Sequence, residues 1–284
     1  MPLAQSTPSI EAPIARPVLK WAGGKGRLVP RIIDQLPEKI QTYYEPFVGS
    51  AAVFFALASQ RRFKRAVLSD QNRELVDVYR ALQKDVHAVI KALSPHHYSR
   101  ETFYRLREQD PTQLDLAERA ARTIYLNKAG FNGLYRVNRS GQFNVPFGRH
   151  VNPTICDEAR LVQAAVLLKS VKLEVQDFEA ACVKAKSGDA VYFDPPYVPL
   201  SKTSNFTAYH HEAFDEVHHR RLADLFGRLV ERGVSVVLSN SDTPLTRKLY
   251  GKWRPQKIMV ARPINSKTTH RGDVPEILVV SRAE

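Results

Sequence analysis

The chain contains little cysteine and no long apolar run. It has 284 residues and two cysteines, Cys156 and Cys182, whose separation fits neither a disulfide framework nor a metal site. No apolar run reaches the ~18 residues that a transmembrane helix needs. The N-terminus also lacks the charged stretch and apolar stretch of a secretory signal. We therefore expect a reduced, cytoplasmic protein with no metal and no membrane contact.

Acidic residues are scarce relative to basic ones. Lys and Arg total 42 against 29 Asp and Glu, which gives a net charge of +13. Such an excess indicates a polyanionic partner, most simply nucleic acid, although an ordinary basic enzyme has the same composition. The hydrophobic content of 43% is enough for the core of one large domain, with or without an insertion. Residues 1–16, rich in Pro, Ser, Ala and Gln, are predicted to form a flexible tail.

Apolar runs alternate with helical patterns along most of the chain. Strands are predicted over residues 43–48, 66–69, 171–175, 190–193, 234–238 and 277–280, and helices over 50–59, 115–128 and 222–232. The alternation lapses over 74–154, where helical segments precede turns rich in Gly and Asn. We predict an α/β fold, a Rossmann-like doubly wound sheet over residues 17–73 and 155–284. Residues 74–154 would be a mostly helical inserted domain.

The tetrapeptide Asp194-Pro195-Pro196-Tyr197 directly follows one predicted strand. The two prolines cannot donate to a strand ladder and so end it. A carboxylate, a rigid backbone carbonyl and an aromatic ring are thereby placed at the carboxyl end of a strand, where open α/β sheets bind ligands. The two acceptors suit an exocyclic amine, and the ring suits the face of a flat base. Taken alone, the tetrapeptide is explained equally well by an ordinary proline turn and by a ligand site.

A second set of residues indicates a cofactor that contains a nucleoside. Glu45, Pro46, Phe47 and Gly49 lie at the first predicted turn from strand to helix, where a small residue lets the backbone approach a ligand. Asp70 ends the next strand about 20 residues later, where an acid accepts ribose hydroxyls. The alternative for Asp70 is a helix cap.

The small number of glycines in this turn argues against a pyrophosphate cofactor. A pyrophosphate cofactor favours a loop richer in glycine, whereas S-adenosylmethionine (AdoMet) has no phosphate and needs carboxylate acceptors such as Asp194. Asp177 and Phe178 would hold its adenine, Lys25 would neutralise its methionyl carboxylate, and Trp21 would pack on the cofactor. The alternative for Asp177 and Phe178 is a capped turn with a core phenylalanine. The alternative for the segment of Trp21 and Lys25 is a surface loop with two glycines.

From about Val18 onward, seven segments in order resemble the Dam family of DNA adenine N6-methyltransferases (D12 class, alpha group). They are residues 20–25; 45–49 with Asp70; 125–136; 141–148; 194–197 with 205–209; 238–242; and 262–271. The resemblance implies that the Trp21 segment packs beside the first turn. It also implies AdoMet contacts by Lys25, Asp70, Asp177, Phe178 and Asp194.

The sequence departs from the family at Ala51, where many relatives carry a second glycine. If this position requires a positive φ, alanine costs about 1 kcal/mol. This departure concerns the affinity for the cofactor and leaves the family assignment unchanged.

The resemblance implies direct methyl transfer to N6 of adenine in double-stranded DNA, without a metal. The catalytic residues would be Asp194, Pro195, Pro196 and Tyr197. The Asp194 carboxylate and the Pro195 carbonyl would accept the N6 protons and localise the lone pair of the amine. The adenine must first be flipped out of the duplex, and Tyr197 would stack on it.

The same resemblance assigns the inserted domain, residues 74–154, to target recognition. Arg136 would read a guanine in the major groove, Phe131 would enter the base stack, and Asn132 would hold the orphaned base. Further expected DNA contacts are Lys20, Leu134, Asn138 and Pro146 and the phosphate-binding Arg139, Arg149, Lys267 and Arg271. For Arg139 and Arg149 a solvated surface position is the alternative.

GATC is the target sequence that the resemblance favours. An alternative is the same chemistry on another DNA site, in a restriction-modification methylase with a cognate endonuclease. An RNA or protein N-methyltransferase, or a DNA-binding protein that has lost its chemistry, are further alternatives. We expect a monomer.

Overall fold

The computed structural model describes residues 15–21, 25–26, 28–138, 141–199, 214–261 and 273–281. In chain order the elements are α1 (Val29–Ile33), β1 (Ile40–Glu45), α2 (Ala52–Ser59), β2 (Phe63–Asp70), α3 (Arg73–Leu93), α4 (Arg100–Glu108), η1 (Pro111–Gln113), α5 (Leu116–Ala129), η2 (Phe131–Gly133), α6 (Glu158–Leu168), β3 (Val171–Val175), α7 (Phe178–Ala181), β4 (Ala190–Phe193), α8 (Glu216–Glu231), β5 (Ser235–Ser241), α9 (Pro244–Tyr250), η3 (Gly251–Trp253), β6 (Gln256–Ala261) and β7 (Asp273–Ser281).

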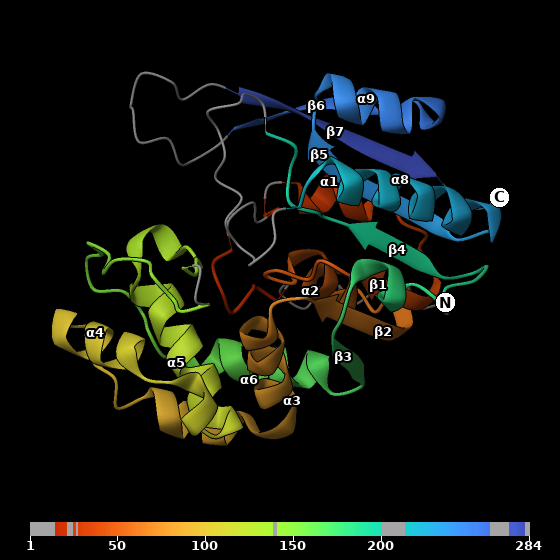
Figure 1. Cartoon of the computed structure of the whole chain (residues 1–284). Coiled ribbons are helices and arrows are strands. Elements are labelled where there is room, and N and C mark those ends of the chain that lie inside the picture. Colours follow the sequence, from red (N-terminus) through yellow and green to blue (C-terminus); the bar gives the residue numbers. More distant parts are fainter. Residues whose placement is uncertain are drawn as a thin grey trace, which may run out of the picture.

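These strands form one mixed sheet of seven strands in the order β3-β2-β1-β4-β5-β7-β6. The first five run parallel, and β7 runs antiparallel to both of its neighbours. The strand order changes direction between β1 and β4, which lie side by side in the middle of the sheet (Figure 1). Ligands of doubly wound sheets bind at the carboxyl ends of the strands at such a point. The predicted α/β fold is confirmed.

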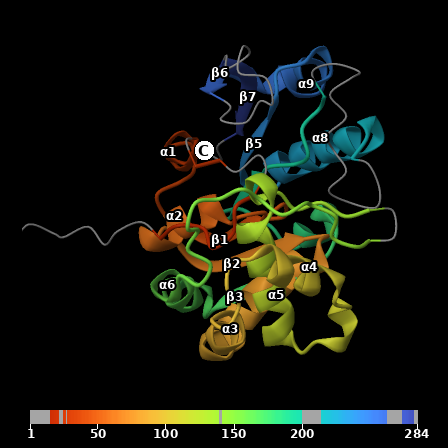
Figure 2. The ribbon, with the colours of Figure 1, turned by 90° about the vertical axis from the view of Figure 1, so that its left-hand side faces the viewer.

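Strand β4 shows how the two faces of the sheet are buried. Its four residues, AVYF, are all buried, as expected for a central strand of a parallel sheet. Because side chains alternate between faces, Ala190 and Tyr192 join one apolar cluster and Val191 and Phe193 join the other. Helices α1, α2 and α6 lie on one side of the sheet and α8 and α9 on the other (Figure 2).

The predicted strands differ from the observed ones mainly at their ends. Residues 171–175 and 190–193 are β3 and β4 as predicted. Strand β1 covers residues 40–45, whereas the prediction was 43–48, because Pro46 cannot donate to the ladder and ends it. The antiparallel edge strand β6 was not predicted, since its sequence QKIMVA mixes polar and apolar residues.

The inserted segment begins with helices that pack on one another. Ion pairs join α3 to α5, between Asp77 and Arg119 and between Glu74 and Arg122. Helix α5 starts with a capping box formed by Asp115 and Glu118, which fits the predicted start of this helix. Figure 1 shows α4 and α5 set to one side of the sheet. Antiparallel bridges between residues 130 and 147 and between 137 and 143 follow.

Candidate active site

The carboxyl ends of four neighbouring strands bring several predicted site residues together. Gly49 follows β1, Asp70 ends β2, and Asp194 directly follows β4. Strand β5 ends in the polar run from Ser239 to Ser241, all of it buried. The parallel pairing of these strands places their carboxyl ends at one edge of the sheet.

The Asp194 carboxylate is paired with Lys25 at this edge. Lys25 Nζ lies 2.8 Å from Asp194 Oδ1, and the two side chains are 7% and 21% exposed. The same ammonium lies 4.4 Å from the centre of the Tyr197 ring. Burial raises the pKa of Asp194, and the positive charge of Lys25 opposes that rise. The N-terminal segment and the loop after β4 thus meet at one carboxylate.

The loop after β4 is held by β5 and β7. The Tyr197 hydroxyl donates to Glu276 Oε2 over 2.9 Å, and the Val198 amide donates to Asn240 Oδ1 over 3.1 Å. Ser239 Oγ donates to Asp194 Oδ1 over 3.2 Å. Pro195 is buried, whereas Pro196 and Tyr197 are partly exposed. Three successive points of the loop are therefore fixed to the sheet.

The first turn has an unusual backbone, which its residues explain. Gly49 has a φ of +45°, and a Cβ added there would lie 2.9 Å from Trp21 Cδ1. Trp21 therefore packs against this turn, as the resemblance implies. Ala51 has a φ of +57°, so it does occupy a position that favours glycine. The Tyr79 hydroxyl fixes the turn by donating to the Gly49 carbonyl over 2.6 Å.

Asp70 lies between this turn and the start of α3. Its Oδ2 accepts from the Gly49 amide at 3.4 Å and its Oδ1 from the Asn72 amide at 3.0 Å. The residue that caps α3 is Asn72, whose side chain accepts from the Leu75 amide. The alternative role of Asp70 as the helix cap is therefore wrong.

Glu45 lies inside the fold, beneath the first turn. It is 3% exposed, and its Oε2 accepts hydrogen bonds from the Tyr43 hydroxyl at 2.8 Å and from the Phe54 amide at 3.0 Å. Burial raises the pKa of Glu45 to about 8. Pro46 is buried beside it and Phe47 is partly exposed. The contact of Glu45, Pro46 and Phe47 with a cofactor stays a prediction.

Asp177 and Phe178 form a capped turn with a core phenylalanine, which was the alternative to a cofactor contact. Asp177 caps α7 by accepting from the Glu179 amide at 2.9 Å, and Phe178 is 2% exposed and stacks on Phe47 with ring centres 5.4 Å apart. Arg221 of α8 donates to Asp177 Oδ1 at 3.1 Å. Such a turn also places a carboxylate and a ring side by side, so the adenine contact stays a prediction.

The predicted DNA-reading residues gather on the segment after α5. Asn127 ties this segment to the N-terminal one, because it bonds both the amide and the carbonyl of Lys20 and the carbonyl of Gly133. Phe131 is 48% exposed, and Asn132 has a φ of +55°. The other exposed members are Arg136, Pro146 and Arg149, while Leu134 and Asn138 are partly exposed.

Arg136 is held in an ordered position on this segment. Its Nε donates to Asn144 Oδ1 at 2.7 Å and its Nη2 to the Asn144 carbonyl at 3.2 Å. The guanidinium is nevertheless exposed. Arg139, Lys267 and Arg271, and the segments 205–209 and 262–270, lie outside the described residues.

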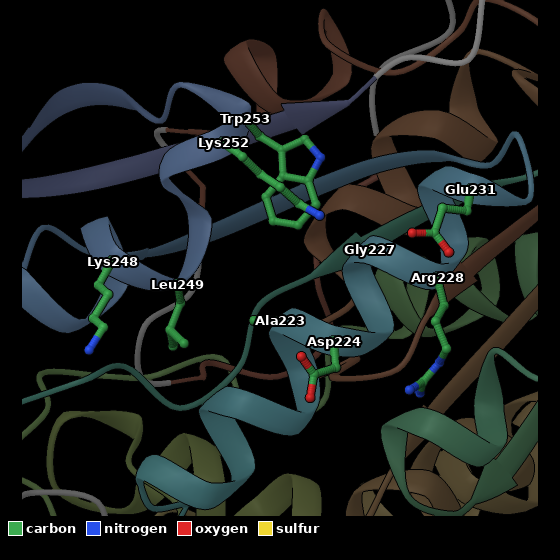
Figure 3. A pocket seen from close by; sticks show the side chains of 9 residues that line it. All are labelled: Ala223, Asp224, Gly227, Arg228, Glu231, Lys248, Leu249, Lys252 and Trp253. Atoms are coloured by element: carbon green, nitrogen blue, oxygen red, sulfur yellow. The ribbon is translucent and has the colours of Figure 1, made fainter.

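A hollow of about 440 Å³ lies elsewhere, between α8 and the chain from α9 to η3 (Figure 3). No predicted site residue lines it. Its walls are Ala223, Asp224, Gly227, Arg228, Glu231, Lys248, Leu249, Lys252 and Trp253. Three cations and two carboxylates line it, so groups of both charges face the same hollow.

Some residues that contact the site were not among those predicted. Ser239, Asn240 and Glu276 touch the loop after β4, and Arg221 touches Asp177. The sequence held a signal for the first two, a polar run at the end of an apolar strand. Glu276 interrupts an apolar strand with an acid, which is a weaker signal of the same kind.

A search of the described parts of the chain gives two negative findings. No group of three or more His, Cys, Asp or Glu side chains there is arranged to hold a metal ion. No helix among the described residues is both long enough and apolar enough to cross a bilayer.

The chain also matches known proteins along most of its length. The family model for the D12 class N6 adenine-specific DNA methyltransferase matches residues 21–264. The chain is 43% identical to the Type II methyltransferase M1.LlaDCHI of Lactococcus lactis subsp. cremoris, over 94% of this chain and 95% of the relative. It is 39% identical to the Type II methyltransferase M.MjaIII of Methanocaldococcus jannaschii, over 94% and 99%. It is 37% identical to the DNA adenine methylase of Escherichia coli K12, over 93% and 95%.

Proposed function

We propose a reaction scheme for this chain, which belongs to the D12 class of N6 adenine-specific DNA methyltransferases. The enzyme methylates adenine in DNA. In our scheme the methyl donor is AdoMet, and the acceptor is an adenine that has been flipped out of duplex DNA. The observation that carries the scheme is the position of Asp194-Pro195-Pro196-Tyr197 at the carboxyl end of β4, beside Lys25 and next to the turn after β1.

The residues around this turn fit a nucleoside with a charged amino-acid end. Asp70, 8% exposed, would accept the ribose hydroxyls. Asp177 and Phe178 would hold the adenine, and the Lys25 ammonium would hold the methionyl carboxylate. The bound cofactor supplies an activated methyl group on a sulfonium sulfur. The positive φ of Gly49 is one that glycine adopts without strain, and the absence of a Cβ leaves room for the Trp21 ring.

Asp194 would act on the target amine. The lone pair of adenine N6 is delocalised into the ring, so the free amine is a poor nucleophile. Acceptance of one N6 proton by Asp194 and of the other by the Pro195 carbonyl would localise that lone pair and hold it in line for attack. As the new N–C bond forms and the S–C bond breaks, one N6 proton passes to the Asp194 carboxylate. Tyr197 would stack on the base.

Target choice would lie with the exposed segment after α5. Arg136 presents a planar fork that can bind guanine O6 and N7, a contact worth about 1–3 kcal/mol of discrimination. Phe131, half exposed on η2, would fill the place that the flipped adenine leaves, with Asn132 on the orphaned partner. Lys20, Leu134 and Pro146 would make further base contacts. We propose GATC as the sequence, on the resemblance that residues 125–148 carry.

A methylation assay tests this scheme. Labelled methyl transfer from AdoMet is measured on duplexes that contain GATC, on duplexes in which each base of that site is replaced, and on RNA and protein. We expect label in adenine of the GATC duplex, and no label after Asp194→Ala, although that variant still folds and binds DNA. Label on another DNA sequence would reject GATC and keep the chemistry. Near-normal transfer by Asp194→Ala would reject the proposed role of this carboxylate.

A further inference from the structure

A chain of hydrogen bonds connects the catalytic carboxylate to two buried hydroxyl groups. Ser239 Oγ donates to Asp194 Oδ1 over 3.2 Å, and the Tyr192 hydroxyl lies 2.9 Å from the same Ser239 oxygen. Ser239 has a single proton. Since that proton goes to the carboxylate, the Tyr192 hydroxyl must be the donor in the second bond.

The sheet itself builds this chain. Phe193 of β4 pairs with Leu238 of β5, so Asp194 and Ser239, which follow directly, are neighbours across two strands. Tyr192 precedes Asp194 by two residues and therefore points to the same face. Ser239 is 0% and Tyr192 1% exposed. Most buried hydroxyls have a hydrogen-bond partner, and these two groups have one another and Asp194.

These hydrogen bonds determine which oxygen of Asp194 is left to accept a proton of the target amine. Oδ1 accepts both from Lys25 Nζ at 2.8 Å and from Ser239 at 3.2 Å. No hydrogen bond to Oδ2 is found from any of the described residues. Two donors on one oxygen fix the rotation of the carboxylate, which leaves Oδ2 as the acceptor for the target amine.

We propose that Ser239 and Tyr192 are positioning residues for methyl transfer, which act by turning Asp194 so that Oδ2 faces adenine N6. This inference rests on the proposed role of Asp194. Because both side chains are buried, neither would touch the base or the cofactor. Their effect falls on the rate of methyl transfer and leaves the binding of either substrate unchanged.

Three variants and a control test the proposal by single-turnover methylation of a duplex that the wild type methylates. Ser239→Ala and Tyr192→Phe each remove one hydroxyl, and the third variant combines them. The control is Tyr250→Phe, because the buried Tyr250 hydroxyl has no hydrogen-bond partner among the described residues. We expect each single variant to lose about tenfold in rate, as a hydrogen bond to a charged group implies. The dissociation constants for AdoMet and DNA should stay within about twofold of wild type.

The double variant decides whether the two hydroxyls act in series. Because Tyr192 acts through Ser239, the double variant should be no slower than Ser239→Ala alone. A multiplied loss of about a hundredfold, an equal loss in Tyr250→Phe, or rates within twofold of wild type would overturn the proposal. If Ser239→Ala does not fold, the comparison of the methylation rates of Tyr192→Phe and Tyr250→Phe still tests the proposal. Wild-type activity and its loss in Asp194→Ala test the reaction scheme separately.

A pH profile gives a readout that a merely structural role would not change. Transfer requires ionised Asp194, and the Ser239 hydrogen bond lowers the pKa of that group against the larger effect of burial. Ser239→Ala should therefore move the acid limb of the rate profile to higher pH, while Tyr250→Phe should not. An unmoved acid limb would count against the proposal. The titratable groups that face Asp194 are Lys25, Tyr43, Glu45, Tyr192 and Tyr197.

Discussion

Removal of the Lys25 charge should destabilise the fold mainly through Asp194. Lys25→Met keeps the length of the side chain and leaves the Asp194 carboxylate, 21% exposed, without its cation at 2.8 Å. Breaking a buried ion pair by removing one partner costs about 3–5 kcal/mol. Because Asp194 is not fully buried, we take the lower end, about 3 kcal/mol. In a chain of this length that corresponds to a fall of roughly 6 °C in the melting temperature.

A double-mutant cycle separates the ion pair from side-chain packing. Asp194→Asn leaves Lys25 unpaired, and the variant that carries both substitutions removes both charges. We expect the double variant to melt above Lys25→Met, with a coupling energy of about 3 kcal/mol. Differential scanning calorimetry of the four proteins, without AdoMet or DNA, gives the cycle. A Lys25→Met protein that melts like the wild type, or a double variant less stable than Lys25→Met, would refute the reasoning.

The pH dependence of this deficit follows from the pKa of Asp194. That pKa is raised above 3.8 in the folded protein by burial, and the Lys25 charge opposes the rise. The variant should therefore have an even higher pKa at Asp194. A raised carboxyl pKa gives stability that is present at low pH and is lost as the pH rises through it. The deficit of Lys25→Met should therefore be largest above the pKa of Asp194 in the variant and shrink on acidification.

Three further predictions concern separate parts of the molecule. Ala51→Gly should raise the melting temperature by roughly 2 °C, because glycine relieves about 1 kcal/mol of strain at a φ of +57°; a lower melting temperature would contradict this. Burial raises the pKa of Glu45 from 4.5 to about 8, so the stability of the wild type should fall as the pH rises from 4.5 to 8. The stability of Glu45→Gln, measured by thermal melts, should fall less over the same range. Arg136→Lys should lose about tenfold in discrimination at one base of the target, measured with single-base variants, since lysine lacks the fork. Unchanged discrimination would remove its role as a reader.

Some elements were predictable because a few adjacent residues determine them. Strand β4 is a short apolar run that Pro195 ends, and β3 is a short run with polar residues on both sides. Both strands were therefore predicted at their observed ends. Strand β2 was predicted over four residues and has eight, because it also includes the exposed Lys64 and the exposed Arg65, which pairs with Thr42 of β1. Polar residues at the end of a strand are not recognised by a search for a hydrophobic pattern.

The site was predictable in its residue types more than in its contacts. The carboxylate of Asp194 and the glycine turn were found from strand ends and spacing. The partners that hold them come from far along the chain: Tyr197 and Glu276 are 79 residues apart, and Lys20 and Asn127 are 107 apart. No local pattern encodes such pairs. The strand order provides the first of them, because it places β5 beside β4 and β7 beside β5 in the folded sheet.

The central claim is that this protein methylates adenine N6 in a defined sequence of duplex DNA, with Asp194 on the target amine. The most direct test is single-molecule sequencing of unmethylated plasmid DNA after incubation with the purified protein and AdoMet, beside the Asp194→Ala variant. We predict N6-methyladenine at GATC sites and at no other adenine, with none from the variant. Plasmid without modified adenine, or modification by the variant at the wild-type level, would contradict it.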